Sequence, residues 1–271
     1  MSHLARLEAI SSPQNPILKE IKRATGRGGL TSDGCCVAEG FHLLEEALRS
    51  DVEIVAVVAT ESAVSAAAGL ADRNAPERTL KTRFLSMPEA LFRTVSSTEN
   101  AQGVLALVRP PSWTEDDVFG STPLVLVLDG IQDPGNAGTL LRAAEGFGAT
   151  GAVLLKGTVS PWNPKMLRAS AGSLFRLPIL DLLTPAGLLE VFTRRNIPLW
   201  MTVASGGQHP GHVDLMAACG LVIGNEAHGI SEEIRLSGKG LSIPTRSVES
   251  LNAAVAGSIL LYEAARQRGK M

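Results

Sequence analysis

The sequence of 271 residues has few cysteines, no long hydrophobic run and no large excess of charge. Its three cysteines, Cys35, Cys36 and Cys219, form no C-x-x-C pair and lie far from any histidine at ligand spacing. This argues against a disulfide framework and a zinc site, and we predict no metal. A net charge of −2 argues against a protein that coats itself in nucleic acid.

No stretch approaches the roughly 18 apolar residues that a membrane-spanning helix needs. The N-terminal stretch MSHLARLEAISSPQNP has no apolar core of the signal-peptide kind. These two absences predict a cytoplasmic protein with no membrane partner. A hydrophobic content of 45% is ample for real cores, and the length allows two modest domains.

The stretch at residues 108–123, VRPPSWTEDDVFGSTP, combines prolines with an acidic cluster and has no apolar period. It predicts a linker at 111–122 between a domain at 1–110 and a domain at 123–271. Residues 1–30 carry an excess of three positive charges. Lys19, Lys22 and Arg23 in this region are candidate RNA contacts, although the charge pattern alone favours a solvated helix face.

Strands alternate with helices in the C-terminal domain. The segment PLVLVLDGI is a continuous apolar run, typical of a parallel strand that is buried on both faces. The segments GAVLL, LPIL, IPLWMTVA, CGLVIGNE and LSIP are further expected strands, and an apolar helix ends the chain. The pattern predicts an open, mostly parallel α/β sheet, whose ligands sit beyond the carboxyl ends of its strands.

Polar residues follow three of these strands. In DPGNAGTLLRAAEGFGA, Asn136 is expected to cap a helix, and Arg142 points away from the apolar face of that helix, so packing does not require it. In LVIGNEAHGIS, Glu226 stands at the tip of a buried strand, an awkward place for a residue that serves solubility alone. In LSIPTRSVESLNAAVAGS, Ser250 and Asn252 are expected in the first helical turn, where unpaired N–H groups face outward. Glu249 fits a contact with the helix dipole and receives no catalytic role.

In this order and spacing, the three loops resemble the motifs of the SpoU-type (TrmH-like) RNA ribose 2′-O-methyltransferases, within the SPOUT class. The resemblance runs from Pro123 to the C-terminus. It extends more loosely into the N-terminal half, where ISSPQNPILKEIKR, VAEGFHLLEEAL and SSTENAQGVLALV resemble the RNA substrate-binding domain of many members, which is related to a ribosomal-protein-like α/β fold.

The resemblance implies a deep trefoil knot at the C-terminal end, S-adenosylmethionine as the cofactor, and a homodimer formed through the knotted domain. The apolar helix body at residues 253–262 would then lie partly between subunits. The implied catalytic and RNA-contact positions are Asn136, Arg142, Glu226, Ser250 and Asn252. The implied cofactor pocket consists of Thr202, Ile223, Gly224, Ile243 and Leu251. The segment PWNPKMLRASAGSLFRLP adds Lys165 and Arg168 as residues near the RNA.

The implied reaction is an in-line attack of a ribose 2′-hydroxyl on a sulfonium methyl group, in which positioning and removal of the hydroxyl proton both contribute. The counterpart of Arg142 is proposed in the family to assist deprotonation. Because a guanidinium stays protonated, a phosphate clamp that orients the ribose is physically easier, with an RNA phosphate as proton acceptor. Glu226 and Asn136 are expected to position Arg142, while Ser250 and Asn252 orient the ribose or the cofactor.

These expectations favour an enzyme that methylates ribosomal RNA. Transfer RNA is the nearest alternative substrate. A noncatalytic RNA-binding ribosome-assembly factor with the same fold is an alternative of another class. A nicotinamide-dependent enzyme is a third, but the glycines of GNAG do not form the G-x-G-x-x-G fingerprint that such a site uses.

Overall fold

The computed structural model describes residues 7–27 and 29–269 and divides into two compact units. The first unit holds the chain up to Ser112 together with Trp162–Arg176, and the second holds Trp113–Pro161 and the chain from Leu177 onward. Residues 162–176 thus pack with the N-terminal unit, although the sequence division assigned them to the C-terminal domain. Each unit is described by itself.

The predicted linker at 111–122 needs correction, because most of it folds as part of the second unit. Residues Glu115–Phe119 form the short helix α5. The side chain of Thr114 caps this helix and makes a capping box with Asp117. Val118 and Phe119 are buried in the core of the second unit. The acidic cluster that suggested a linker is therefore the first turn of a helix, where negative charge is stabilising.

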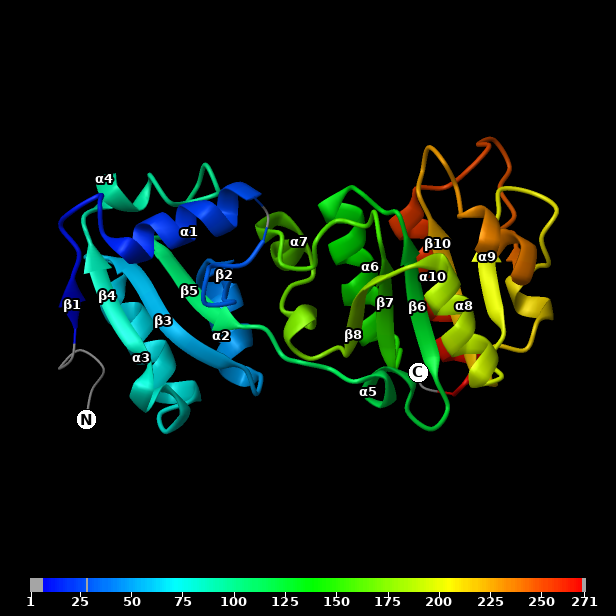
Figure 1. The fold of residues 1–271 in the computed structure, drawn as a ribbon, viewed down its shortest axis with the longest axis horizontal. Helices are drawn as coiled ribbons and strands as arrows, with labels where there is room; N and C mark the ends of the chain where they lie inside the picture. Colours follow the sequence, from blue (N-terminus) through cyan, green and yellow to red (C-terminus); the bar gives the residue numbers. More distant parts are fainter. Residues whose placement is uncertain (1–6, 28, 270–271) are drawn as a thin grey trace. The chain divides into compact units, whose positions relative to one another are not determined.

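The first unit is a mixed α/β layer structure (Figure 1). Its strands are β1 (Glu8–Ala9), β2 (Cys36–Glu39), β3 (Glu53–Thr60), β4 (Arg83–Met87) and β5 (Val104–Arg109). Its helices are α1 (Pro16–Arg27), α2 (Phe41–Arg49), α3 (Val64–Asn74), α4 (Glu89–Phe92) and α7 (Pro164–Ala169). The strand order is β1-β4-β3-β5-β2, in which β1, β4 and β3 run parallel and β5 is antiparallel to both of its neighbours.

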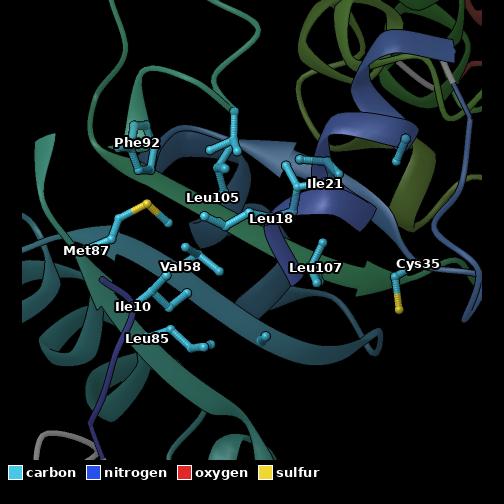
Figure 2. Packing of buried hydrophobic residues seen from close by; sticks show 14 residues of the cluster. Ile10, Leu18, Ile21, Cys35, Val58, Leu85, Met87, Phe92, Leu105 and Leu107 are labelled. Carbon is cyan, nitrogen blue, oxygen red and sulfur yellow. The ribbon is translucent and has the colours of Figure 1, made fainter. Parts of the chain in front are cut away.

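Alternating side chains of the central strands pack against α1 and form a hydrophobic core with it. Leu18 and Ile21 of α1 are completely buried and belong to one cluster with Val58, Leu105 and other sheet residues (Figure 2). Successive strand residues point to opposite faces of a sheet, so the intervening residues face the other side. Helices α2 and α3 contact β5, β3 and β4.

The second unit contains a sheet of neighbouring parallel strands, which confirms the predicted open α/β architecture. Its strands are β6 (Leu124–Asp129), β7 (Gly151–Leu155), β8 (Ile179–Leu183), β9 (Leu199–Thr202), β10 (Cys219–Gly224) and β11 (Lys239–Leu241). Beside α5, its helices are α6 (Pro134–Gly146), α8 (Pro185–Arg194), α9 (Glu232–Ser237) and α10 (Ala253–Gln267). The strand order is β11-β9-β10-β6-β7-β8.

Helices cover this sheet on both sides, which explains why β6 is apolar at successive positions and fully buried. Side chains of α5, α8 and α9 share one core cluster with the sheet. Helix α10 instead packs on α6 and β10. In parallel register, Gly224 of β10 pairs with Asp129 of β6, and Leu241 of β11 pairs with Thr202 of β9. The loops that follow these strands therefore leave the sheet at the same edge.

The three cysteines are buried and form no disulfide with one another. Burial raises the pKa of each of these thiols. Among the described residues, no group of histidine, cysteine or acidic side chains is arranged to hold a metal ion. No helix in the described part of the chain is long and apolar enough to cross a membrane.

Candidate active site

The loop after β6 places Asn136 inside helix α6 instead of at its cap. Asp133 is the N-cap, and its carboxylate accepts a hydrogen bond of 2.7 Å from the backbone N–H of Asn136. Pro134 takes the first helical position, where the lack of an N–H costs nothing. The expectation that Asn136 caps the helix is therefore wrong. Since Asp133 satisfies the helix end, the Asn136 amide is available for other partners.

The loop after β10 is a tight turn fixed to the loop after β6. Asn225 and Gly229 exchange backbone hydrogen bonds across the turn, of 3.0 and 2.9 Å. The Asn225 amide donates to the carbonyl of Gly130 at 2.7 Å. Farther along, the backbone N–H of Ser231 donates to the Asp129 carboxylate at 2.7 Å. These bonds hold the turn that carries Glu226 beside the start of α6.

A chain of three side chains then connects the three polar loops. The amide nitrogen of Asn136 donates to Oε1 of Glu226 at 2.5 Å. Its amide oxygen accepts from the amide nitrogen of Asn252 at 3.1 Å. Asn136 is thus the central member, with one partner after β10 and another at the start of α10. The structure brings together three residues that the sequence places far apart.

Helix α10 begins later than the sequence predicts. Its first residue is Ala253, and Asn252 is the N-cap, whose amide oxygen accepts from the backbone N–H groups of Ala254 at 2.9 Å and Val255 at 3.2 Å. Ser250 consequently lies in the preceding loop and not in the first helical turn. The physical reason is that the Asn252 amide oxygen satisfies two of the N–H groups that a helix leaves free at its start.

A cavity of about 310 Å³ lies at the carboxyl ends of β9, β10 and β11. The residues predicted to bind the cofactor all line it, namely Thr202, Ile223, Gly224, Ile243 and Leu251. Three of the predicted catalytic residues line it as well, namely Glu226, Ser250 and Asn252. Ile223 is buried in the cavity wall, whereas Glu226, Ser250 and Asn252 are exposed and form its polar rim. The cavity combines an apolar interior with a polar rim, which is typical of small-molecule sites.

Sequence reasoning missed several residues of the cavity wall. These are Val203, Ala204, Asn225, Ile230 and Thr245, and also Glu249, which was given only a contact with the helix dipole. The sequence signal that could have identified them is their position, because each lies in or next to a loop that follows a predicted strand. Glu249 stands four residues before the first residue of α10 and outside its first turn, so the dipole does not account for it.

Arg142 and Asn136 do not line the cavity. Arg142 is exposed on α6 and makes no hydrogen bond or ion pair with any described residue. The expectation that Asn136 and Glu226 position Arg142 is therefore not met in this structure, because those two side chains bond to each other. A guanidinium without a partner on the protein is available to an external anion.

The residues predicted to contact RNA belong to the first unit. Lys19 and Lys22 are exposed on α1, while Arg23 pairs with Glu20 at 3.1 Å. Lys165 is exposed on α7. Arg168, on the same helix, is different: its guanidinium donates to the hydroxyl of Ser97 at 2.8 Å.

Arg168 also lies 3.5 Å from the carboxylate of Glu39, which is only 5% exposed. Glu39 accepts hydrogen bonds from the hydroxyls of Ser96, Ser97 and Thr98, and from the backbone N–H of Ser97 at 3.0 Å. Burial raises the pKa of this carboxyl, but the hydrogen bonds together outweigh burial and the net pKa is lowered. Arg168 therefore compensates a buried charge through one nitrogen of its guanidinium.

Comparison with known proteins gives a consistent result for both halves of the chain. Residues 123–262 match the model of the SpoU rRNA Methylase family. Residues 15–106 match the model of the MRM3-like substrate binding domain. An uncharacterized tRNA/rRNA methyltransferase of Synechocystis is 35% identical over 97% of this chain and 95% of its own length. The 23S rRNA (guanosine(2553)-2′-O)-methyltransferase RlmP of Bacillus subtilis is 29% identical over 94% of this chain and 98% of its own.

Solved structures agree with the sequence comparison. The SpoU methyltransferase AviRb of Streptomyces viridochromogenes, in complex with the cofactor AdoMet, superimposes with a TM-score of 0.80 at 27% identity, over 95% of this chain and 100% of that chain. An AdoMet-bound rRNA methyltransferase of Sinorhizobium meliloti gives a TM-score of 0.78 at 27% identity, over 96% of this chain and 98% of that chain.

Proposed function

Because the chain belongs to the SpoU rRNA methylase family, we propose that it transfers a methyl group from S-adenosylmethionine to a ribose 2′-hydroxyl of ribosomal RNA. The observation that carries this proposal is the cavity at the strand ends, whose wall contains the residues predicted to hold the cofactor. The chain of Glu226, Asn136 and Asn252 joins the loops around the same cavity.

The cavity fits S-adenosylmethionine in size and chemistry. Its volume of about 310 Å³ is in the range of small-molecule sites. Ile223, Ile243 and Leu251 offer apolar surface for a purine ring, and Glu226 and Glu249 offer negative charge for a cationic ligand. When bound, the cofactor supplies a methyl carbon attached to a positively charged sulfur. The protein's task is to hold the acceptor hydroxyl in line with that carbon.

The roles of the protein side chains follow from where they lie. Arg142 is exposed outside the cavity, so it binds an RNA phosphate and fixes the ribose against the cavity mouth. It does not remove the hydroxyl proton, since a guanidinium has no acceptor lone pair available. Ser250 is exposed at the cavity wall and orients the ribose. Asn136, Glu226 and Asn252 act by holding the loops in register.

Ribosomal RNA is the proposed substrate. The match of residues 15–106 to a substrate-binding domain supports this, as does the similarity to RlmP, a methyltransferase of 23S ribosomal RNA. Exposed Lys19 and Lys22 on α1 provide positive charge in that unit for contacts to phosphate. We also propose that the reaction takes place in the cytoplasm, because the similar RlmP is a bacterial enzyme of ribosomal RNA.

We further propose a knotted, homodimeric catalytic unit. Family membership supports a deep trefoil knot. The path of the chain agrees with this, because the segment after β11 lies beside the loop after β9. There the backbone N–H of Ser242 donates to the carbonyl of Gln208 at 3.0 Å. Exposed Val255, Ile259 and Tyr262 share one face of α10, which supports a subunit contact there.

An assay of methyl transfer tests the proposal, with RNA that is purified from cells lacking this gene as the substrate. The purified chain is incubated with S-adenosylmethionine labelled in its methyl group and total RNA, and the labelled ribose is mapped. We expect label at a 2′-oxygen of ribosomal RNA. Label confined to transfer RNA would reassign the substrate. Cofactor binding without transfer to any RNA would instead favour a noncatalytic RNA-binding factor.

A further inference from the structure

The cavity has an unbalanced charge. Among the described residues that line it, two are ionisable, Glu226 and Glu249, and neither has a basic partner in the wall. A wall of this kind attracts a cationic ligand and gives no such attraction to a neutral one.

The two carboxylates differ in what they already bind. Glu226 accepts a hydrogen bond from the Asn136 amide and so takes part in holding the loops together. Glu249 makes no hydrogen bond or ion pair with any described residue and lies directly before Ser250 in the loop that forms one side of the cavity. Neither helix capping nor the dipole of α10 uses this carboxylate, because Asn252 is the cap.

Methyl transfer changes the charge of the molecule that occupies such a site. The methyl carbon forms its bond to the ribose 2′-oxygen as its bond to sulfur breaks, the electron pair of the broken bond stays on sulfur, and the hydroxyl proton leaves to phosphate or water. The donor carries a positive sulfonium, whereas the product, S-adenosylhomocysteine, carries a neutral thioether. A free carboxylate in the wall therefore interacts more favourably with the donor than with the product.

We propose that Glu249 is a specificity-determining residue that makes the cavity prefer the charged methyl donor over the neutral product. The inference rests on the proposed function, in that the cavity must hold the cofactor. Its consequence is that loss of the sulfonium charge weakens binding and favours release of the product. Because Glu249 is exposed, we expect a modest preference, about threefold in the ratio of dissociation constants.

Calorimetric titration of the full chain with S-adenosylmethionine and with S-adenosylhomocysteine tests this without reference to catalysis. Glu249→Gln removes the charge and keeps the size, Glu249→Asp keeps the charge, and Glu233→Gln removes an exposed charge on α9 that does not line the cavity. We expect Glu249→Gln to lower the donor-over-product preference about threefold, and the effect to shrink at high salt. Glu249→Asp should retain most of the preference and Glu233→Gln all of it.

Equal weakening of both ligands in Glu249→Gln would overturn the inference and leave the cofactor site intact, because the carboxylate would then recognise a group common to donor and product. An unchanged ratio in Glu249→Gln would overturn it as well. If the unaltered chain bound neither ligand, the cofactor site itself would be wrong, and the inference with it.

Discussion

Asn136 and Asn252 lie 116 positions apart in the chain and share a hydrogen bond of 3.1 Å between their side-chain amides. The direction of this bond is fixed by the other partners of each amide. Asn136 gives its N–H to Glu226, so its oxygen faces Asn252. Asn252 uses its own oxygen to cap α10, so its N–H faces Asn136. Each residue therefore tolerates only one amide orientation.

Replacing Asn252 separates its two roles. Asn252→Asp keeps an oxygen that caps α10 but loses the N–H donor and sets a carboxylate against the oxygen of Asn136. We expect stability within about 0.5 kcal/mol of the unaltered chain and methyl transfer reduced by about tenfold or more. Asn252→Ala loses the cap as well, and should cost about 1 kcal/mol in the free energy of unfolding.

Denaturant unfolding and single-turnover methyl transfer measure these two effects separately. Equal activity of Asn252→Asp and the unaltered chain would show that the bond to Asn136 serves no catalytic purpose. A large loss of stability in Asn252→Asp would show that the cap depends on more than the amide oxygen.

Arg142 is expected to act on RNA alone. Because it lies outside the cavity and has no protein partner in the described chain, Arg142→Ala should abolish methyl transfer and leave the affinity for S-adenosylmethionine near normal. Arg142→Lys keeps the charge without the planar two-pronged donor, so its activity should be recovered only in part. Calorimetry with the cofactor and transfer assays with RNA measure the two properties. An active Arg142→Ala variant would exclude the assignment.

Glu39 should stabilise the first unit in a pH-dependent way. Its folded-state pKa is lowered below the ordinary value of 4.5, so the folded state binds fewer protons than the unfolded state near that pH. The stabilisation is then fully present above the ordinary pKa and is lost as the pH falls through the lowered folded-state value. Glu39→Ala, which leaves Arg168 and several donors without their acceptor, should cost about 2–4 kcal/mol at neutral pH.

The matched control is Glu89→Gln, since Glu89 on α4 makes an exposed ion pair of 3.5 Å with Arg93. It should change stability by less than about 0.5 kcal/mol. Denaturant unfolding at neutral pH compares the loss of stability in Glu39→Ala with that in Glu89→Gln. Unfolding of Glu39→Gln and the unaltered chain from acidic to neutral pH then measures how the free energy of unfolding depends on pH when the Glu39 carboxylate is absent. If Glu39→Gln kept the acid dependence of the unaltered chain, another carboxylate would be responsible.

The exposed face of α10 should control association. Ile259 is 39% exposed beside Val255 and Tyr262. A charge placed there would have to be desolvated in a subunit interface, so Ile259→Asp should shift a dimer toward monomer by about tenfold or more in dissociation constant. Leu236→Asp, at a residue of α9 that is 79% exposed, is the control. Analytical ultracentrifugation measures both variants. A monomeric unaltered chain, or a dimer unaffected by Ile259→Asp, would contradict the proposed interface.

Local pattern was sufficient for much of the second unit. The continuous apolar run of β6 predicted a strand buried on both faces, because residues on an interior parallel strand have no solvent side. The polar residues after β6, β10 and β11 were predicted to lie at the same edge of the sheet, and they do so because neighbouring parallel strands end side by side. Pattern failed where short-range signals competed: prolines and acids at residues 108–123 suggested a linker, while the capping box at Thr114 specified a helix.

The sequence by itself determined which residue types stand at the strand ends, because that depends on hydrophobic periodicity along the chain. Only the tertiary structure decided how they pair. It gave the Asn136 amide to Glu226 and Asn252, left Arg142 without a hydrogen-bond or ion-pair partner among the residues that the structure describes, and used Arg168 to balance the buried charge of Glu39. It also brought Glu249 to the cavity wall. The physical reason is that a side-chain hydrogen bond depends on distance in space, and residues a hundred positions apart carry no local signal of it.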